Sequence, residues 1–182
     1  TVGAPYRTGG AWKLTADMAP KTAEDKAFMA SCPYKEAVGA LHYLSRGTRG
    51  DIALSVSQVA KFCHDPGVKH WRAVERIYHW LHQTIDSRHK IAAANLELEY
   101  FADASYNDCA DTNMSTTGFL FRAGGETLSW YSKRQSLWAQ SSTEAEFMAQ
   151  AVASNELVWW RALWHWDDLG FDPGKMSAAP TG

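Results

Sequence analysis

Residues 115–131 read S-T-T-G-F-L-F-R-A-G-G-E-T-L-S-W-Y, and this stretch determines the fold. It contains two apolar or β-branched runs, 116–121 and 127–131, with Gly124-Gly125 between them. Two adjacent glycines between such runs are typical of a tight hairpin, because glycine adopts the positive φ angles that the turn requires. The stretch therefore predicts two antiparallel strands.

A further strand and a long helix flank this hairpin. Residues 96–101, L-E-L-E-Y-F, alternate between apolar and polar side chains, which is the two-residue period of a strand. Residues 143–168 carry apolar side chains near helical spacing, and Gly170 and Pro173 follow as stop signals. The predicted order is β-β-β-α, which is a mixed α/β pattern.

Residues 33–94 predict a small module of three short amphipathic helices. Pro33 suits a first helical position, since the N–H that proline lacks would be unpaired there. Asp51 suits the N-cap of the second helix, and the Asp65-Pro66-Gly67 turn precedes the third. Residues 1–32 are rich in Gly, Pro, Ala, Thr and Lys, and this composition predicts a linker or an extended arm.

The composition is that of an ordinary globular chain. Of 182 residues, 46% are hydrophobic and 21% are charged, which argues against general disorder. No run of 18 apolar residues occurs, so no membrane span is predicted. The first ten residues lack the apolar core of a secretion signal, and the three cysteines are odd in number without a C-x-x-C pair. We therefore expect a non-secreted protein in a reducing compartment.

Charge is distributed unevenly along the chain. Residues 1–95 hold 13 Lys and Arg against 8 Asp and Glu, whereas residues 96–182 hold 5 against 12. A basic arm followed by an acidic module suits a protein that holds a polyanion with one part and metal cations with the other. Chance segregation of solvated faces is the alternative, and the charges alone leave it open.

Asp103 and Glu146 are candidate metal ligands. Asp103 ends the first strand in F-A-D-A-S, and Glu146 lies one turn into the long helix. Carboxylates on a strand end and on a packed helix can converge, and converging carboxylates hold Mg²⁺, which prefers oxygen ligands. A capping role is the alternative: Thr143-x-x-Glu146 matches a capping box, and Ser141-x-x-Glu144 is equally ambiguous.

Three other patterns have both a functional and a structural interpretation. His79 and His82, near Cys63 and His64, could bind zinc or simply line an exposed helix face. A tryptophan cluster could stack on bases or pack in the core, and several cations could contact phosphates or remain solvated. The tryptophans are Trp159, Trp160, Trp164 and Trp166, and the cations are Lys69, Arg72, Arg76, Lys133 and Arg134.

Seven strings resemble the C-terminal reverse transcriptase and ribonuclease H region of copia-type (Pseudoviridae) retrotransposon polyproteins. They occur in the family's order and at about its spacing, over most of the chain. They are P-Y-K-E-A-V-G-A-L-H-Y-L-S (33–45), T-R-G-D-I-A-L-S-V-S-Q-V-A-K-F (48–62), H-W-R-A-V-E-R-I-Y-H-W-L (70–81), F-A-D-A-S (101–105), S-T-T-G-F-L-F (115–121), S-W-Y-S-K-R-Q (129–135) and S-S-T-E-A-E-F-M-A (141–149).

This resemblance implies a fold and an activity. The fold is a partial ribonuclease H-like mixed sheet over residues 95–182, preceded by the helical connection over 33–94 that ends the reverse transcriptase. The implied activity is Mg²⁺-dependent hydrolysis of the RNA strand of RNA–DNA hybrids, at a two-metal site that includes Asp103 and Glu146. The implied partners are the hybrid and the remainder of the Pol polyprotein, in cytoplasmic virus-like particles or the nucleus, without a membrane.

The chain also departs from the family. Family members continue past the long helix into a strand that carries a further catalytic Asp, where this chain reads K-M-S-A-A-P-T-G. Asp167 and Asp168 stand where the family has ordinary helix-end residues. We therefore expect the last strand and the last carboxylates to be missing. Two hypotheses follow, an endonuclease that needs further residues, and a non-catalytic remnant or repurposed module that binds nucleic acid or protein.

Overall fold

The protein forms two compact units. The computed structural model describes residues 3–6, 13–87, 98–164 and 177–178. The helical unit comprises residues 1–88 with 110–112, and the sheet unit comprises 89–109 with 113–182. Within the described residues, we find no helix whose length and apolar content would let it cross a lipid bilayer.

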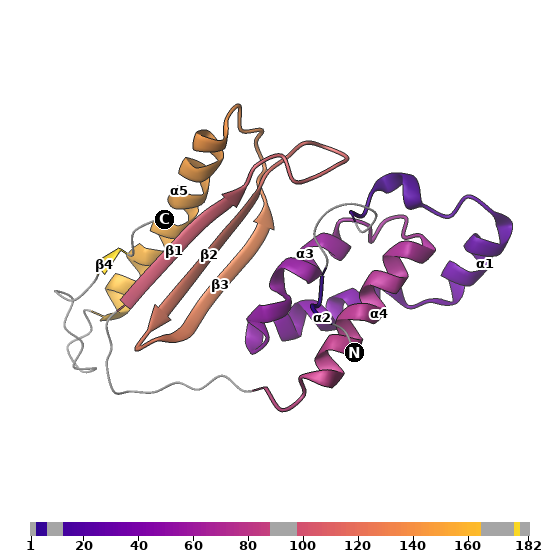
Figure 1. Ribbon diagram of the computed structural model, residues 1–182, viewed down its shortest axis with the longest axis horizontal. Coiled ribbons are helices and arrows are strands. Elements are labelled where there is room, and N and C mark those ends of the chain that lie inside the picture. The colour runs from indigo at the N-terminus through magenta and orange to yellow at the C-terminus, as the bar shows by residue number, and fades with distance from the viewer. Residues whose placement is uncertain (1–2, 7–12, 88–97, 165–176, 179–182) are drawn as a thin grey trace. The chain divides into compact units, whose positions relative to one another are not determined.

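The helical unit packs short helices around one apolar core (Figure 1). Its elements are η2 (Ala16–Met18), α1 (Ala23–Ser31), α2 (Tyr34–Gly47), η3 (Gly50–Ile52), α3 (Ala53–Ala60) and α4 (Val68–Gln83). The residues that are fully buried in this core are Leu41, Ile52, Val56, Val59, Val74 and Ile77. Ile52 ends η3, and the others lie on α2, α3 and α4, where buried residues recur at helical spacing, so the three predicted helices are confirmed.

Two expectations about this unit were wrong. Residues 23–31 form α1 rather than an extended arm, because the Thr22 hydroxyl accepts a hydrogen bond from the Asp25 N–H and caps the helix. Asp51 does not cap α3. Its carboxylate accepts hydrogen bonds from the Arg49 guanidinium at 2.7 and 2.8 Å and from the Trp80 indole at 2.7 Å.

His70 is a buried structural residue on α4. Its Nδ1 accepts a hydrogen bond from the Gly67 N–H at 2.8 Å, its Nε2 lies 3.0 Å from the Thr15 carbonyl oxygen, and its ring stacks on Phe62. A neutral ring protonated at Nε2 satisfies both contacts. Burial lowers the pKa of His70 below its usual 6.5.

We expect this histidine to make the helical unit less stable in mild acid. Because the native pKa is lowered, the unfolded chain takes up a proton near pH 6.5 that the native ring does not bind. The stabilisation that the buried neutral ring of His70 contributes is intact above pH 6.5, and it is lost as the pH falls toward the native pKa. In urea titrations between pH 7.5 and 5.5, His70→Asn should flatten the decline of the unfolding free energy. The exposed-site variant His79→Asn should keep it, and equal slopes in all three proteins would contradict the prediction.

The sheet unit contains a four-stranded mixed sheet. Strands β1 (Leu98–Ser105), β2 (Thr116–Ala123), β3 (Glu126–Arg134) and β4 (Ser177–Ala178) lie in the order β3-β2-β1-β4. The hairpin between β2 and β3 is confirmed: Gly124 and Gly125 have φ angles of 58° and 84°, and Ala123 pairs with Glu126. A register shift between Phe121 and Arg122 adds a bulge that the sequence did not predict.

One face of this sheet is covered by α5 (Ser142–Trp164), as Figure 1 shows. Three alanines four residues apart, Ala145, Ala149 and Ala153, are fully buried. Side chains this small let the helix approach the sheet closely. Leu98 and Ala102 of β1, Phe119, Phe121 and Ala123 of β2, and Ala153 form the buried core.

The expectation of no strand after the long helix was wrong. β4 pairs in parallel with β1, with Ser177 opposite Glu99 and Ala178 opposite Tyr100. This pairing uses only backbone groups, so small polar residues without a strand pattern can form it. Within the described residues, β4 does not extend along β1 as far as Asp103.

Candidate functional site

The two glutamates near the start of α5, Glu144 and Glu146, have different roles. The Ser141 carbonyl accepts the Ala145 N–H, and the Ser141 hydroxyl accepts the Glu144 N–H at 3.1 Å. The Glu144 carboxylate accepts the Gln140 N–H at 2.6 Å. Capping is therefore the role of Ser141 and Glu144, and the interpretation of Thr143 and Glu146 as a capping box was wrong.

Glu146 and Asp103 lie side by side. Asp103 is exposed near the end of β1, opposite Gly118 of β2, and directly follows the buried Ala102. The half-buried Glu146 carboxyl is hydrogen-bonded to Asp103 and accepts the backbone N–H of Ala104. Burial, and then the negative charge of Asp103, raise the pKa of Glu146. The two carboxyl groups thus lie close enough for the charge of one to act on the other.

Cation binding is the chemistry that this pair can offer. Neither carboxylate forms an ion pair with a Lys, Arg or His among the residues that the structure describes. No cluster of three or more His, Cys, Asp or Glu suited to a metal is found there either. Asp167 and Asp168 lie outside the described residues. The pair can provide two of the six oxygen ligands that Mg²⁺ takes.

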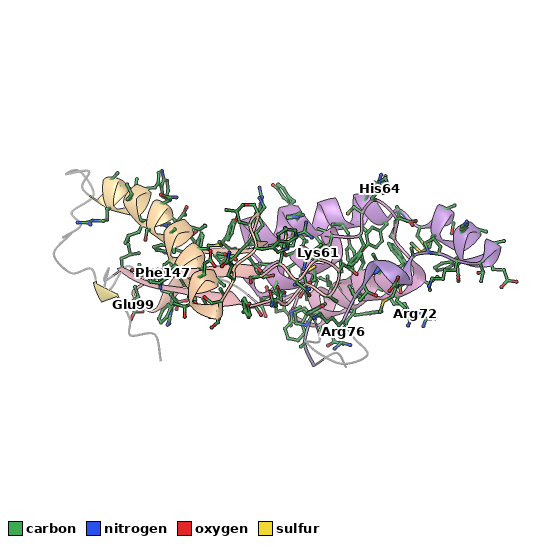
Figure 2. The ribbon with its side chains drawn as sticks, turned by 90° about the horizontal axis from the view of Figure 1, so that it is seen from above. Lys61, His64, Arg72, Arg76, Glu99 and Phe147 are labelled. Carbon is green, nitrogen blue, oxygen red and sulfur yellow. The ribbon has the colours of Figure 1, made fainter. Side chains whose placement is uncertain are left out.

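The predicted phosphate-binding cations fall into two sets. Lys69 and Arg72 are exposed on α4, whereas Arg76 is half-buried and donates from Nε to the Ala4 carbonyl at 3.0 Å. Figure 2 shows Arg72 and Arg76 on one side of the helical unit and His64 on the other. Lys133 and Arg134 are exposed at the end of β3, in the sheet unit. Each set is a basic patch of its own unit.

Comparison with known proteins identifies relatives. The chain is 39% identical over 150 residues to the Retrovirus-related Pol polyprotein from transposon TNT 1-94 of Nicotiana tabacum, covering 82% of this chain and 11% of that protein. It is 35% identical to the corresponding polyprotein from transposon RE2 of Arabidopsis thaliana, covering 69% and 9%. It is 38% identical over 132 residues to Secreted RxLR effector protein 161 of Plasmopara viticola, covering 72% and 93%. This chain belongs to the copia-type retrotransposon Pol family.

This copia-type chain spans about a tenth of the length of the TNT 1-94 and RE2 polyproteins. No family model matches it, and no solved structure matches it. Because one relative is named a secreted effector, the expectation that this chain is not secreted stays a prediction.

A groove of about 300 Å³ lies between the end of β3 and α5 of the copia-type chain. Its walls are Thr117, Tyr131, Lys133, Arg134, Gln135, Ser136, Leu137, Met148, Ala151 and Val152. Gln135 is buried there and donates from Nε2 to the Thr117 hydroxyl and the Ala145 carbonyl. Sequence reasoning missed this groove, because its walls come from two strands, a loop and a helix that no local pattern connects.

The histidine and tryptophan patterns have structural explanations in this copia-type chain. His79 and His82 are exposed on α4. Trp160 packs against the sheet core, and Trp159 is exposed and meets it edge-on, with 4.9 Å between ring centroids. The Trp164 side chain and Trp166 lie outside the described residues. One ring therefore serves the core, and one faces solvent.

Proposed function

We propose that the sheet unit is the N-terminal part of a ribonuclease H-like domain, which hydrolyses the RNA strand of RNA–DNA hybrids. The observation that carries this proposal is the adjacency of Asp103 and Glu146, two acids 43 positions apart in the sequence. Holding two acids together is electrostatically unfavourable, and groups perturbed in this way cluster at functional sites. Membership in the copia-type Pol family supports the assignment.

Mg²⁺ fits the chemistry of this pair. Asp103 and Glu146 would each provide carboxylate oxygens, and the Ala104 N–H would orient Glu146. The bound cation would supply positive charge at the reacting phosphodiester. Further ligands would come from water, from the substrate phosphate and from residues elsewhere in Pol.

The remaining parts of the chain would serve the same reaction. We assign residues 33–94 to the helical connection at the end of the reverse transcriptase. The two basic patches would contact phosphates without reading sequence. The partners would then be the hybrid and the remainder of Pol, in virus-like particles of the cytoplasm or in the nucleus.

A cleavage assay tests the proposal. The full chain is incubated with a hybrid labelled on its RNA strand and Mg²⁺, beside Asp103→Asn, Glu146→Gln and the matched control Glu144→Gln. We expect cleavage by the parent chain and the control, and only background from the two site variants. Mg²⁺ should also raise the melting temperature of the parent chain but not of Glu146→Gln. Equal cleavage by all four proteins would contradict the assignment of the site.

A non-catalytic binding module is the second candidate. It is favoured by the lack of a third acid beside the pair among the described residues, and by the near-complete match to a protein named as an effector. Such a module would bind the hybrid without cleaving it. Its affinity would be unchanged in Asp103→Asn, whereas Arg72→Ala with Lys133→Ala would weaken it.

A further inference from the structure

The side of α5 that faces away from the sheet carries a stripe of residues that includes two large, exposed apolar side chains. Ala145, Ala149 and Ala153 face the sheet, and the opposite side presents large apolar groups to solvent. Phe147, labelled in Figure 2, is 71% exposed, and Val158 is 67% exposed. We call this side the outer stripe, and its residues are Glu144, Phe147, Ala151, Ser154, Val158 and Arg161.

The spacing of the outer stripe suits packing against another helix. Its members alternate between three and four residues apart, which is the spacing of a coiled-coil seam. Phe147 and Val158 are the large members, and the small Ala151 and Ser154 lie between them. Small central side chains let two helix axes approach closely.

The stripe is also symmetric about its own midpoint. A two-fold axis between residues 152 and 153 would place Phe147 opposite Val158 of a second copy, and Ala151 opposite Ser154. The same operation would place Glu144 opposite Arg161, so charges of opposite sign meet at both ends. A symmetric dimer requires this kind of self-complementary surface. A parallel pairing would instead set Glu144 against Glu144 and Arg161 against Arg161.

We propose that α5 is a homodimer interface, on which the outer stripes of two copies pack antiparallel. The stripe spans about 26 Å, at 1.5 Å per helical residue. An interface of one helix pair is smaller than a standard protein interface, so the dimer is weak and depends on concentration. The proposal is independent of the nuclease activity.

Sedimentation of the full chain over a concentration series tests the interface. We expect the mass to rise from 20.3 kDa toward twice that value as the concentration increases. Phe147→Glu should stay monomeric throughout. Leu137→Glu changes another exposed apolar residue, 66% exposed and outside the stripe, and should keep the dimer. A parent chain that is monomeric at every concentration would overturn the proposal, as would a Phe147→Glu variant that associates normally.

Charge exchange tests the antiparallel arrangement. Arg161→Glu alone should raise the dissociation constant about tenfold, because it sets a second carboxylate against Glu144 at both ends. Glu144→Arg alone should do the same, and the double variant should restore association. Because Glu144 also caps α5, circular dichroism checks that each variant is folded, and Arg161→Glu leaves the cap intact. Single variants that associate like the parent, or a double variant without rescue, would refute this arrangement.

Discussion

Replacing Gly67 with alanine should destabilise the helical unit by at least about 3 kcal/mol. Gly67 is buried where α4 begins, and a Cβ atom there would lie 1.7 Å from the Met18 carbonyl oxygen and 2.8 Å from its carbon. Both atoms belong to the backbone, so no side-chain rotation relieves the overlap. Moving Met18 away from Gly67 would also strain the contact between the Thr15 carbonyl oxygen and His70 Nε2.

Gly39→Ala is the matched control for this prediction. Gly39 lies inside α2, and a Cβ there meets nothing within 4 Å. The same substitution should therefore stabilise the unit slightly, by about 0.5–1 kcal/mol, because alanine is the better helix former. Hydrogen exchange resolved by peptide measures both effects in the helical unit. Protection in Gly67→Ala equal to that of the parent chain would show that Met18 and Gly67 are not packed together.

Local patterns predicted the helices and strands whose sequence signals lie within the element itself or directly beside it. Gly124-Gly125 specified the hairpin, because a turn with two positive φ angles has few alternatives. The periodic apolar residues of α2 and α4 predicted helices, because each helix must bury one face. α1 was missed although Thr22, three residues before Asp25, is an N-terminal signal, because its Ala-rich sequence lacks a clear apolar face.

Contacts between residues far apart in the sequence could not be predicted from those local patterns. Asp51 reads locally as a helix cap, and only the fold brings Trp80 to its carboxylate. β4 has no strand pattern and exists because β1 offers a backbone edge at Glu99 and Tyr100. In both cases the deciding partner is distant in sequence, so a local pattern contains no information about it.

In the candidate site, too, local patterns predicted some features, and contacts between distant residues determined the others. Spacing alone left Glu144 and Glu146 equally suited to capping, and the starting point of α5 at Ser142 decides between them. The approach of Glu146 to Asp103 follows from packing the buried alanine face of α5 on the sheet. Family resemblance predicted that approach, whereas periodicity could not.

Phe121→Ala should cost the sheet unit about 3–5 kcal/mol. Phe121 is fully buried in β2, an inner strand that pairs with β1 and β3. Its ring stacks on Tyr100 at 5.7 Å and meets Phe119 edge-on at 5.5 Å between centroids. Truncation removes both ring contacts and leaves a cavity that paired strands cannot collapse to fill. The bulge beside Phe121 adds to the cost, because packing of this ring helps to fix the register.

Phe101→Ala is the matched control, because it truncates a strand phenylalanine that is not buried in this core. Phe101 lies in β1, is 39% exposed and pairs with Leu120, so its truncation leaves no enclosed cavity and should cost below about 1.5 kcal/mol. Hydrogen exchange of β1 and β2 peptides, beside urea unfolding, measures both variants. If both variants lower the free energy of unfolding by the same amount, burial of the Phe121 ring does not stabilise the sheet unit as predicted. If Phe121→Ala leaves β1 protected, Tyr100 does not depend on that ring, and the strand that holds Asp103 is stabilised from elsewhere.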